Sequence, residues 1–313
     1  MYDYVIVGAG SAGCVLANRL SEDPDVRVLL VEAGPPDTAD FIHIPAAFSA
    51  LFRTQHDWDH ITGWEPGANN RRIYLPRGRM LGGSSSMNAM IYIRGNPLDY
   101  DSWRDAGCEG WGFADVLPYF LRSEGNERGG GRFHNGSGPL TVTDQRSPNI
   151  TTLAYVEAAR EAGFDVNPDF NAESQDGFGI YQVTQRAGRR CSAATAFLKP
   201  AVERRNLSVV TNAHASRIIV ERGRATGVEA VVDGRRQTFR ADRAVVLAAG
   251  AIGTPQLLLL SGIGPADGLA AHGIDVVIDS PNVGRNLQDH VVSGASWHTP
   301  RPITMVGAQP RPW

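Results

Sequence analysis

The chain has 313 residues, of which 42% are hydrophobic and 20% are charged, and its formal net charge is −3. This length allows one large domain or two ordinary ones, with the composition of a globular protein. The near-neutral charge argues against a general nucleic-acid binder, because such a protein needs a basic field. No apolar run of 18 or more residues occurs, so no membrane span is expected.

The three cysteines are widely spaced and odd in number: Cys14, Cys108 and Cys191. They fit neither a disulfide framework nor a zinc site. Reduced thiols of this kind are typical of cytoplasmic proteins. The first residues lack the basic start of a signal peptide and run directly into a strand pattern. We therefore expect a cytoplasmic protein without a metal site.

The N-terminal segment carries the first functional pattern. Residues 4–7 form a short apolar run, typical of a strand buried on both faces of a parallel sheet. The glycine turn Gly8-Ala-Gly10-Ser-Ala-Gly13 follows at once, and apolar residues then recur at helical spacing. A second apolar strand, residues 26–31, ends at Glu32, about 20 residues after Gly13. This order of strand, glycine turn, helix, strand and acid predicts a dinucleotide site.

Each residue type in this unit has a physical reason. Gly8 permits the tight turn, Gly10 lets a pyrophosphate approach the backbone, and Gly13 lets the helix pack close to the strand. The helix N-terminus offers N–H groups to phosphates, and Glu32 can accept hydrogen bonds from ribose hydroxyls. The predicted contacts of this unit are Gly8, Gly10, Ser11, Ala12, Gly13, Glu32 and Ala33. The pattern does not separate NAD from FAD.

Two longer segments are more specific. The first, residues 77–101, contains Gly82-Gly-Ser-Ser-Ser-Met-Asn88 followed by Ala-Met-Ile91. The second, residues 250–264, reads Gly-Ala-Ile-Gly-Thr-Pro-Gln-Leu-Leu-Leu-Leu-Ser-Gly-Ile-Gly. In this order they resemble the two signatures of the glucose–methanol–choline (GMC) oxidoreductases, a family of flavoproteins. Three further stretches are also similar to the family, so the resemblance covers about residues 2–300: 56–58, 133–142 and 282–290.

The resemblance implies FAD as the cofactor. An NAD-dependent dehydrogenase is the weaker alternative, because it leaves residues 77–101 without a role. Residues 82–84 are implied to lie along the pyrophosphate and ribityl chain. Residues 88–91 are implied to lie beside the isoalloxazine ring, where a backbone donor can stabilise negative charge on a reduced flavin. The contacts implied in this way are Met80, Gly82, Gly83, Ser84, Asn88, Ala89, Met90, Ile91, Ala215 against the adenine, Ala249 and Gly250. Further candidates for phosphate contacts are Arg77, Arg79 and Arg94.

The implied fold is α/β: a doubly wound, Rossmann-like FAD-binding domain with an antiparallel β insertion, plus an incomplete substrate domain. The FAD-binding domain is expected at residues 1–140 and 191–290, with a flavin lid region at 41–75. The partial substrate domain is expected at residues 141–190 and 291–313. Short strand patterns predict the antiparallel insertion, at residues 207–211, 217–221, 226–232 and 238–240.

Three more elements are expected from local patterns. Residues 244–249 predict a buried strand that rejoins the parallel sheet near the cofactor. A helix is expected to begin at Thr254 and Pro255, because proline is favoured in the first helical turn. Residues 150–163 predict an amphipathic helix that ends at Gly163.

The resemblance implies an oxidoreductase that acts on CH–OH groups of small alcohols, similar to choline dehydrogenases and aryl-alcohol oxidases. In the family, a histidine takes the hydroxyl proton and the alcohol carbon gives hydride to flavin N5. That histidine is implied to lie beyond position 313, so the chain is expected to lack it and no catalytic residue is assigned. A catalytically inactive flavin-binding remnant is the alternative. The alcohol and the electron acceptor (oxygen, a quinone or another) stay open.

Overall fold

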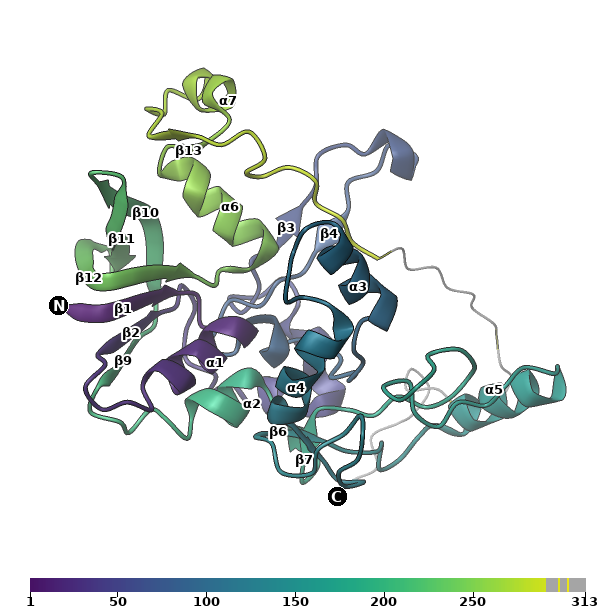
Figure 1. The fold of residues 1–313 in the computed structure, drawn as a ribbon. Helices are drawn as coiled ribbons and strands as arrows, with labels where there is room; N and C mark the ends of the chain where they lie inside the picture. Colours follow the sequence, from purple (N-terminus) through teal and green to yellow (C-terminus); the bar gives the residue numbers. More distant parts are fainter. Residues whose placement is uncertain (291–297, 299–302, 304–313) are drawn as a thin grey trace.

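A six-stranded sheet lies at one end of the protein (Figure 1), a computed structural model in which residues 1–290, 298 and 303 are described. The strand order is β10-β11-β12-β1-β2-β9. Strands β12, β1, β2 and β9 are parallel to one another, and β10, β11 and β12 form an antiparallel meander. The bounds are β1 (Tyr2–Val7), β2 (Val28–Val31), β9 (Leu207–Val210), β10 (Ala213–Glu221), β11 (Arg224–Val232) and β12 (Arg235–Leu247).

Strand β2 and the second half of β1 are buried on both faces, as their continuous apolar sequences predict, whereas β9 and the parallel part of β12 are largely half-buried. Because side chains alternate along a strand, Ile6 and Leu30 pack into one core while Val5 and Leu29 pack into another. The first core includes α1 (Ser11–Leu20) and the single π-helical turn η4 (Ala194–Leu198). The second core includes the meander and Leu257 of α6 (Gly250–Leu260). Helices on both faces of a largely parallel sheet confirm the predicted Rossmann-like α/β fold.

The antiparallel insertion is present, but one of its predicted strands is wrong. The strand at residues 207–211 does not belong to the meander: β9 pairs in parallel with β2 at the edge of the main sheet. The strands predicted at residues 238–240 and 244–249 are continuous with each other in β12, and the second of them is confirmed to rejoin the parallel sheet. The first half of β12 pairs with β11 and its second half pairs in parallel with β1. Local apolar patterns predict strands but not their neighbours, which long-range packing selects.

Helix α6 begins at Gly250, and not at Thr254 and Pro255 as predicted. Gly250 has a left-handed backbone (φ +77°), so the chain turns from β12 into the helix as soon as the strand ends. Pro255 therefore lies inside the helix, where it cannot donate to the carbonyl of Ala251. Ala251 is exposed. The predicted helix at 150–163 is confirmed as α5 (Ile150–Glu161), capped by the side chain of Asn149.

The remaining elements surround the sheet and extend to one side of it. Figure 1 shows α5 at the opposite end of the molecule from the six-stranded sheet, with α3 and α4 between them. The other helices are α2 (Asp40–His43), α3 (Pro97–Asp105), α4 (Phe113–Ser123), α7 (Ala266–Ala271) and the 3₁₀ turns η1 (Pro45–Leu51), η2 (Pro66–Ala68) and η3 (Gly83–Ser86). In the part of the chain that the structure describes, no helix combines the length and the apolar character needed to cross a bilayer.

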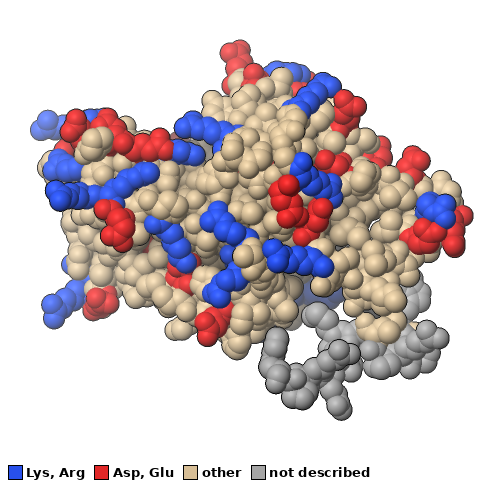
Figure 2. Space-filling view, turned by 90° about the horizontal axis from the view of Figure 1, so that it is seen from below, with Lys and Arg blue, Asp and Glu red and all other residues tan. Residues whose placement is uncertain are grey.

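Four short strand pairs complete the fold: β3 (His60–Ile61) with β4 (Tyr74–Leu75), β5 (Glu124–Asn126) with β6 (Leu140–Val142), β7 (Gln185–Arg186) with β8 (Arg189–Arg190), and β13 (Ile263–Gly264) with β14 (Ile278–Asp279). The second pair spans the predicted domain boundary at 140, the third pair ends at the boundary at 190, and these boundaries stay predictions. All but two of residues 291–313 lie outside the described residues. On the face in Figure 2, acidic and basic side chains are interspersed.

Candidate functional site: a cavity at the carboxyl ends of the parallel strands

A cavity of about 800 Å³ lies at the carboxyl ends of β1, β2 and β12, whose last residues Val7, Val31 and Leu247 form its floor. The first turns of α1 and α6 form part of its walls. This edge of a parallel sheet is where ligands bind in open α/β folds. The cavity also has the size of a cofactor site.

The glycine turn between β1 and α1 assigns a different role to each of its glycines. Gly8 has φ +98°, and a Cβ there would lie 2.6 Å from the carbonyl oxygen of Ala248. A Cβ on Gly13 would lie 1.9 Å from the carbonyl oxygen of Gly8, so this residue lets α1 pack against the turn. A Cβ on Gly10 would meet no atom closer than 4.0 Å. Packing therefore requires Gly8 and Gly13, whereas Gly10 leaves open space on the cavity side.

A second backbone segment, residues 78–84, packs directly on this turn. The Gly82 N–H donates to the carbonyl of Ala9 (2.7 Å). Gly83 has φ +52°, and a Cβ there would lie 2.7 Å from Cα of Gly10. Gly83 and Ser84 thereby reach the cavity wall. The contact with Gly10 explains why position 83 needs glycine, whereas at Gly82 the reason is its φ of +87° and a Cβ that would lie 2.1 Å from Oγ of Ser86.

Two helix N-termini open into the cavity. The cap residues of α1 and α6 are Gly10 and Ala249, and neither uses a side chain to cap its helix. The first-turn N–H groups of a helix have no partner within the helix, and they carry the positive end of its dipole. Ser11 and Ala12 of α1 are exposed on the cavity wall. These groups are suited to hold a pyrophosphate.

Glu32 lies directly after β2, with only 6% of its surface exposed. Its Oε2 accepts a hydrogen bond from the Ala9 N–H (2.8 Å), and its Oε1 accepts one from the Gly34 N–H (2.9 Å). Burial raises the pKa of Glu32, although these hydrogen bonds act in the opposite direction. Each carboxylate oxygen keeps a further lone pair. Glu32 also lines the cavity, so it can accept from ribose hydroxyls.

An aromatic wall near Ala33 and Ala215 was not predicted as part of the site. Trp58 and His60 are stacked, with ring centres 6.0 Å apart, and His214 meets Trp58 edge-on at 5.5 Å. All three line the cavity. Partial burial lowers the pKa of both His60 and His214, as do the charges of Arg77 and Arg79 respectively. The wall therefore presents uncharged rings, which suit a stacked heterocycle.

The structure brings most predicted contacts together and leaves the others nearby. Those that line the cavity are Gly8, Gly10, Ser11, Ala12, Glu32, Ala33, Gly83, Ser84, Ala215, Ala249 and Gly250. Gly13 and Gly82 lie just behind this surface, where they pack against the turn. Met80 is fully buried in a cluster with Ile42, Leu51 and Met87. It therefore supports the wall from behind.

The segment predicted beside the flavin ring, residues 88–91, lies outside the cavity wall. Asn88, Ala89 and Ile91 are exposed. Met90 is buried with φ +61°, an uncommon backbone for this residue type, and its carbonyl accepts from the Thr184 N–H (2.8 Å). The cavity thus contains the predicted contacts around the glycine turn. The predicted contacts at residues 88–91 lie outside the cavity, and three of the four are exposed at the surface.

The three candidate arginines have separate surroundings. Arg77 lines the cavity. The guanidinium of Arg79 lies over the Trp58 ring, 5.3 Å from its centre. Arg94 forms a buried ion pair with Glu124 (2.8 Å) and does not line the cavity, so it is not a phosphate contact there.

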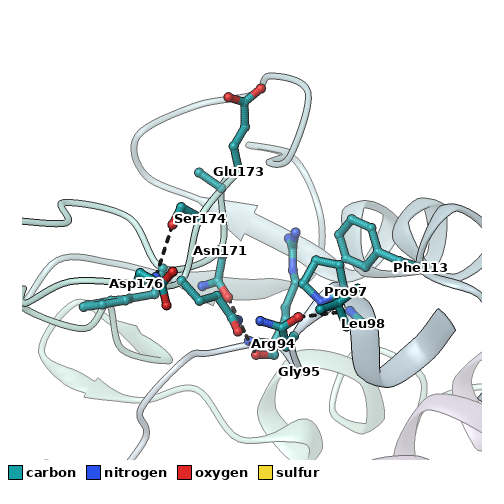
Figure 3. Close-up of a pocket in the computed structure, with 13 residues that line it drawn as sticks. Arg94, Gly95, Pro97, Leu98, Phe113, Asn171, Glu173, Ser174 and Asp176 are labelled. Carbon is teal, nitrogen blue, oxygen red and sulfur yellow. Dashed lines mark hydrogen bonds between the residues drawn. The ribbon is translucent and has the colours of Figure 1, made fainter. Parts of the chain in front are cut away.

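A second, smaller cavity of about 270 Å³ lies at the start of α3, against residues 170–176 (Figure 3). Its polar groups are largely bonded to one another, as the dashed lines in Figure 3 show. The Arg94 N–H donates to Oδ1 of Asn171 (2.7 Å), and the Asp176 N–H donates to Oγ of Ser174 (3.2 Å). Of the predicted contacts, Arg94 alone lines this cavity, and its guanidinium is already paired with Glu124. We therefore take the larger cavity as the candidate site.

A parallel sheet, a glycine turn, uncapped helix N-termini and a buried acid after β2 together define a Rossmann-like dinucleotide-binding protein. The GMC oxidoreductase family matches residues 2–292 of the sequence. The chain therefore belongs to the GMC oxidoreductase family.

Relatives and solved structures agree with this assignment. The chain is 46% identical to the mitochondrial choline dehydrogenase of Homo sapiens over 316 residues, which cover 98% of this chain and 53% of that protein. It is 44% identical to an oxygen-dependent choline dehydrogenase of Sinorhizobium fredii over 314 residues, or 99% of this chain and 57% of the relative. The chain thus spans about half the length of the curated relatives it matches.

Two solved structures have the same fold. Pyridoxine 4-oxidase from Mesorbium loti matches 93% of this chain and 57% of its own, with a TM-score of 0.89 and 41% identity. Formate oxidase of Aspergillus oryzae, in a structure that concerns FAD modification, matches 92% of this chain and 52% of its own, with a TM-score of 0.85 and 31% identity. The family and these neighbours support FAD as the cofactor, rather than NAD.

Proposed function

We propose that this chain is the FAD-binding part of an oxidoreductase that acts on the CH–OH group of a small alcohol. The observation that carries the proposal is the meeting of three features in one cavity. These are the Gly10 turn, the Gly83–Ser84 wall and the carboxylate of Glu32. The Gly10 turn matches the pyrophosphate, the Gly83–Ser84 wall matches the ribityl chain that leads to the flavin ring, and Glu32 matches the adenosine ribose.

In this proposal, the residues of the cavity hold FAD in an extended conformation. The N–H groups at the starts of α1 and α6 bind the pyrophosphate. Glu32 accepts from the ribose, and the aromatic wall of Trp58, His60 and His214 contacts the adenine together with Ala215. Residues 88–91 continue the site toward the isoalloxazine ring. Met80, which is buried behind the cavity wall, supports that wall.

Bound FAD supplies the hydride acceptor for oxidation of the alcohol carbon. The described residues supply positioning: the cavity fixes the nucleotide half, and the 88–91 segment orients donors toward the ring. We assign no proton acceptor among them. The named activities of similar proteins make choline the first alcohol to test. The cytoplasmic location and the domain boundaries given above are part of the same proposal.

The test is a visible absorption spectrum of the purified chain with FAD, recorded without oxygen before and after addition of choline or benzyl alcohol. The proposal predicts flavin bands that remain with the protein after gel filtration, and bleaching by the alcohol would show that this chain turns over by itself. Bands that persist unbleached would favour the alternative, a flavin-binding remnant without turnover. A folded chain that retains no flavin would contradict the proposal.

A further inference from the structure

Arg190, in β8, is among the largest fully buried side chains of the protein, with 2% of its surface exposed. Its Nε donates to the carbonyl of Ile42 (2.7 Å). Its Nη1 donates to the carbonyl of Ser85 (3.2 Å) and to Oδ1 of Asn88 (2.9 Å). Its Nη2 is buried without a hydrogen-bond partner among the described residues. The guanidinium thus lies behind the segment that runs from the cavity wall to residue 91.

The acceptors around Arg190 are neutral. Burial is the cause that lowers its pKa to about 10, and no nearby carboxylate in the described part of the chain acts against it. The group stays protonated at neutral pH. Arg94 shows the usual arrangement for comparison, since its buried guanidinium is paired with Glu124 at 2.8 Å. A buried cation without a counter-charge is costly, and such groups cluster at functional sites.

The contact with Asn88 determines how its amide is oriented. Oδ1 of Asn88 accepts from Arg190 and also from the Met90 N–H (3.0 Å). Both lone pairs of this oxygen are therefore in use, and a guanidinium can only face the oxygen end of an amide. The NH₂ group must point the other way. Because Asn88 is exposed, its two N–H donors are available at the surface of the 88–91 segment.

We propose that Arg190 is a positioning residue for the flavin. It holds the Asn88 amide with its N–H donors toward the isoalloxazine ring, and it places an uncompensated positive charge behind residues 85–88. Both effects stabilise negative charge, which grows on the ring as it takes up electrons. Arg190 therefore raises the reduction potential of bound FAD. The inference rests on the proposed function, in which residues 88–91 lie beside the ring.

The experiment measures the midpoint potential of FAD bound to the full chain, by equilibration with a reference dye of known potential. Arg190→Met removes the charge and the hydrogen bonds while keeping an apolar side chain of similar length. The matched control is Arg204→Met. Arg204 is half-buried and donates to Oγ of Ser21 (2.9 Å) behind α1, away from the cavity.

We expect Arg190→Met to shift the equilibrium between reduced and oxidised flavin toward the oxidised form by at least about tenfold. This factor corresponds to the stabilisation lost with one charged hydrogen bond. This equals about 30 mV in a two-electron potential. Arg204→Met leaves the potential unchanged. Arg190→Lys, which keeps the charge without the planar fork, gives an intermediate shift.

Asn88→Ala provides a second route if Arg190→Met does not fold, and it is expected to lower the potential in the same direction. If these variants bind FAD with an unaltered potential, the inference is overturned and the proposed function stands. If the unaltered chain binds no FAD, the proposed function fails and the inference fails with it. The two failures are therefore distinguished by the spectrum of the unaltered chain.

Discussion

Replacing Gly10 by alanine separates ligand binding from folding at this site. Gly10 caps α1 with an extended backbone (φ −75°, ψ −162°), which alanine adopts without strain. Its new Cβ would have only the Ala248 carbonyl oxygen within reach, at 4.0 Å. The protein therefore has room for the methyl group, and the methyl group occupies space on the cavity side of the turn.

The expected magnitudes follow from these contacts. Alanine reduces the entropy of the unfolded chain, which stabilises the fold by about 0.4–1 kcal/mol. It is also a poorer helix cap than glycine, by an amount of similar size. The unfolding free energy should thus change by less than about 1 kcal/mol. A pyrophosphate displaced from one N–H group loses about 1.5–3 kcal/mol, which is about ten- to hundredfold in FAD affinity.

Gly13→Ala is the matched control for this variant. A Cβ at Gly13 would lie 1.9 Å from the carbonyl oxygen of Gly8, and the turn must shift to admit it. We expect a loss of about 1–3 kcal/mol in unfolding free energy. FAD titration monitored by flavin fluorescence, beside urea unfolding of the apo chains, distinguishes the two variants. If Gly10→Ala binds FAD with unaltered affinity, the pyrophosphate does not approach this turn and the reasoning is refuted.

Glu32→Ala should weaken FAD binding at least about tenfold in the same titration, because it removes the acceptors for the ribose; unaltered affinity would argue against the ribose contact. Burial raises the pKa of the Cys14 thiol to about 12, and Cys191 is also buried. At pH 8 an alkylating reagent should therefore label Cys108 alone in the native chain and all three cysteines after unfolding, as counted by mass spectrometry; rapid native labelling of Cys14 would contradict its burial. The pKa of His214 is lower in the folded chain than its ordinary value of 6.5, so its contribution to stability is present above that pH and is lost as the pH falls through the folded pKa. His214→Gln should flatten the fall of the unfolding free energy between pH 7 and 5, and an identical pH dependence would exclude this group as its source.

Sequence reasoning succeeded where a function depends on neighbouring residues. The turn at Gly8, Gly10 and Gly13 is predictable from its own residues, because the positive φ of Gly8 and the close packing of Gly13 on Gly8 arise within the turn, although Gly8 also lies against Ala248. The apolar runs of β1 and β2 likewise predict burial on both faces.

Apart from the start of α6, where Gly250 itself turns the chain, the misses involve distant parts of the chain. β9 was assigned to the meander because its sequence does not say that it pairs with β2. The aromatic wall joins Trp58 to His214, and although Trp58 lies in a stretch similar to the family, its sequence does not indicate a contact with His214. Arg190 bonds to Ile42, Ser85 and Asn88, each about 100 or more residues away. Such contacts exist only after the fold has assembled, so no local pattern could predict them.

The most direct test of the account is whether the purified chain binds FAD stoichiometrically in this cavity. The measurement is a visible spectrum after gel filtration of the chain incubated with FAD, repeated with excess NAD as competitor and with Gly10→Ala. The account predicts about one flavin per chain, no displacement by NAD, and weaker bands in the variant. A folded chain that elutes colourless, or one whose flavin binding is indifferent to Gly10→Ala, would contradict it.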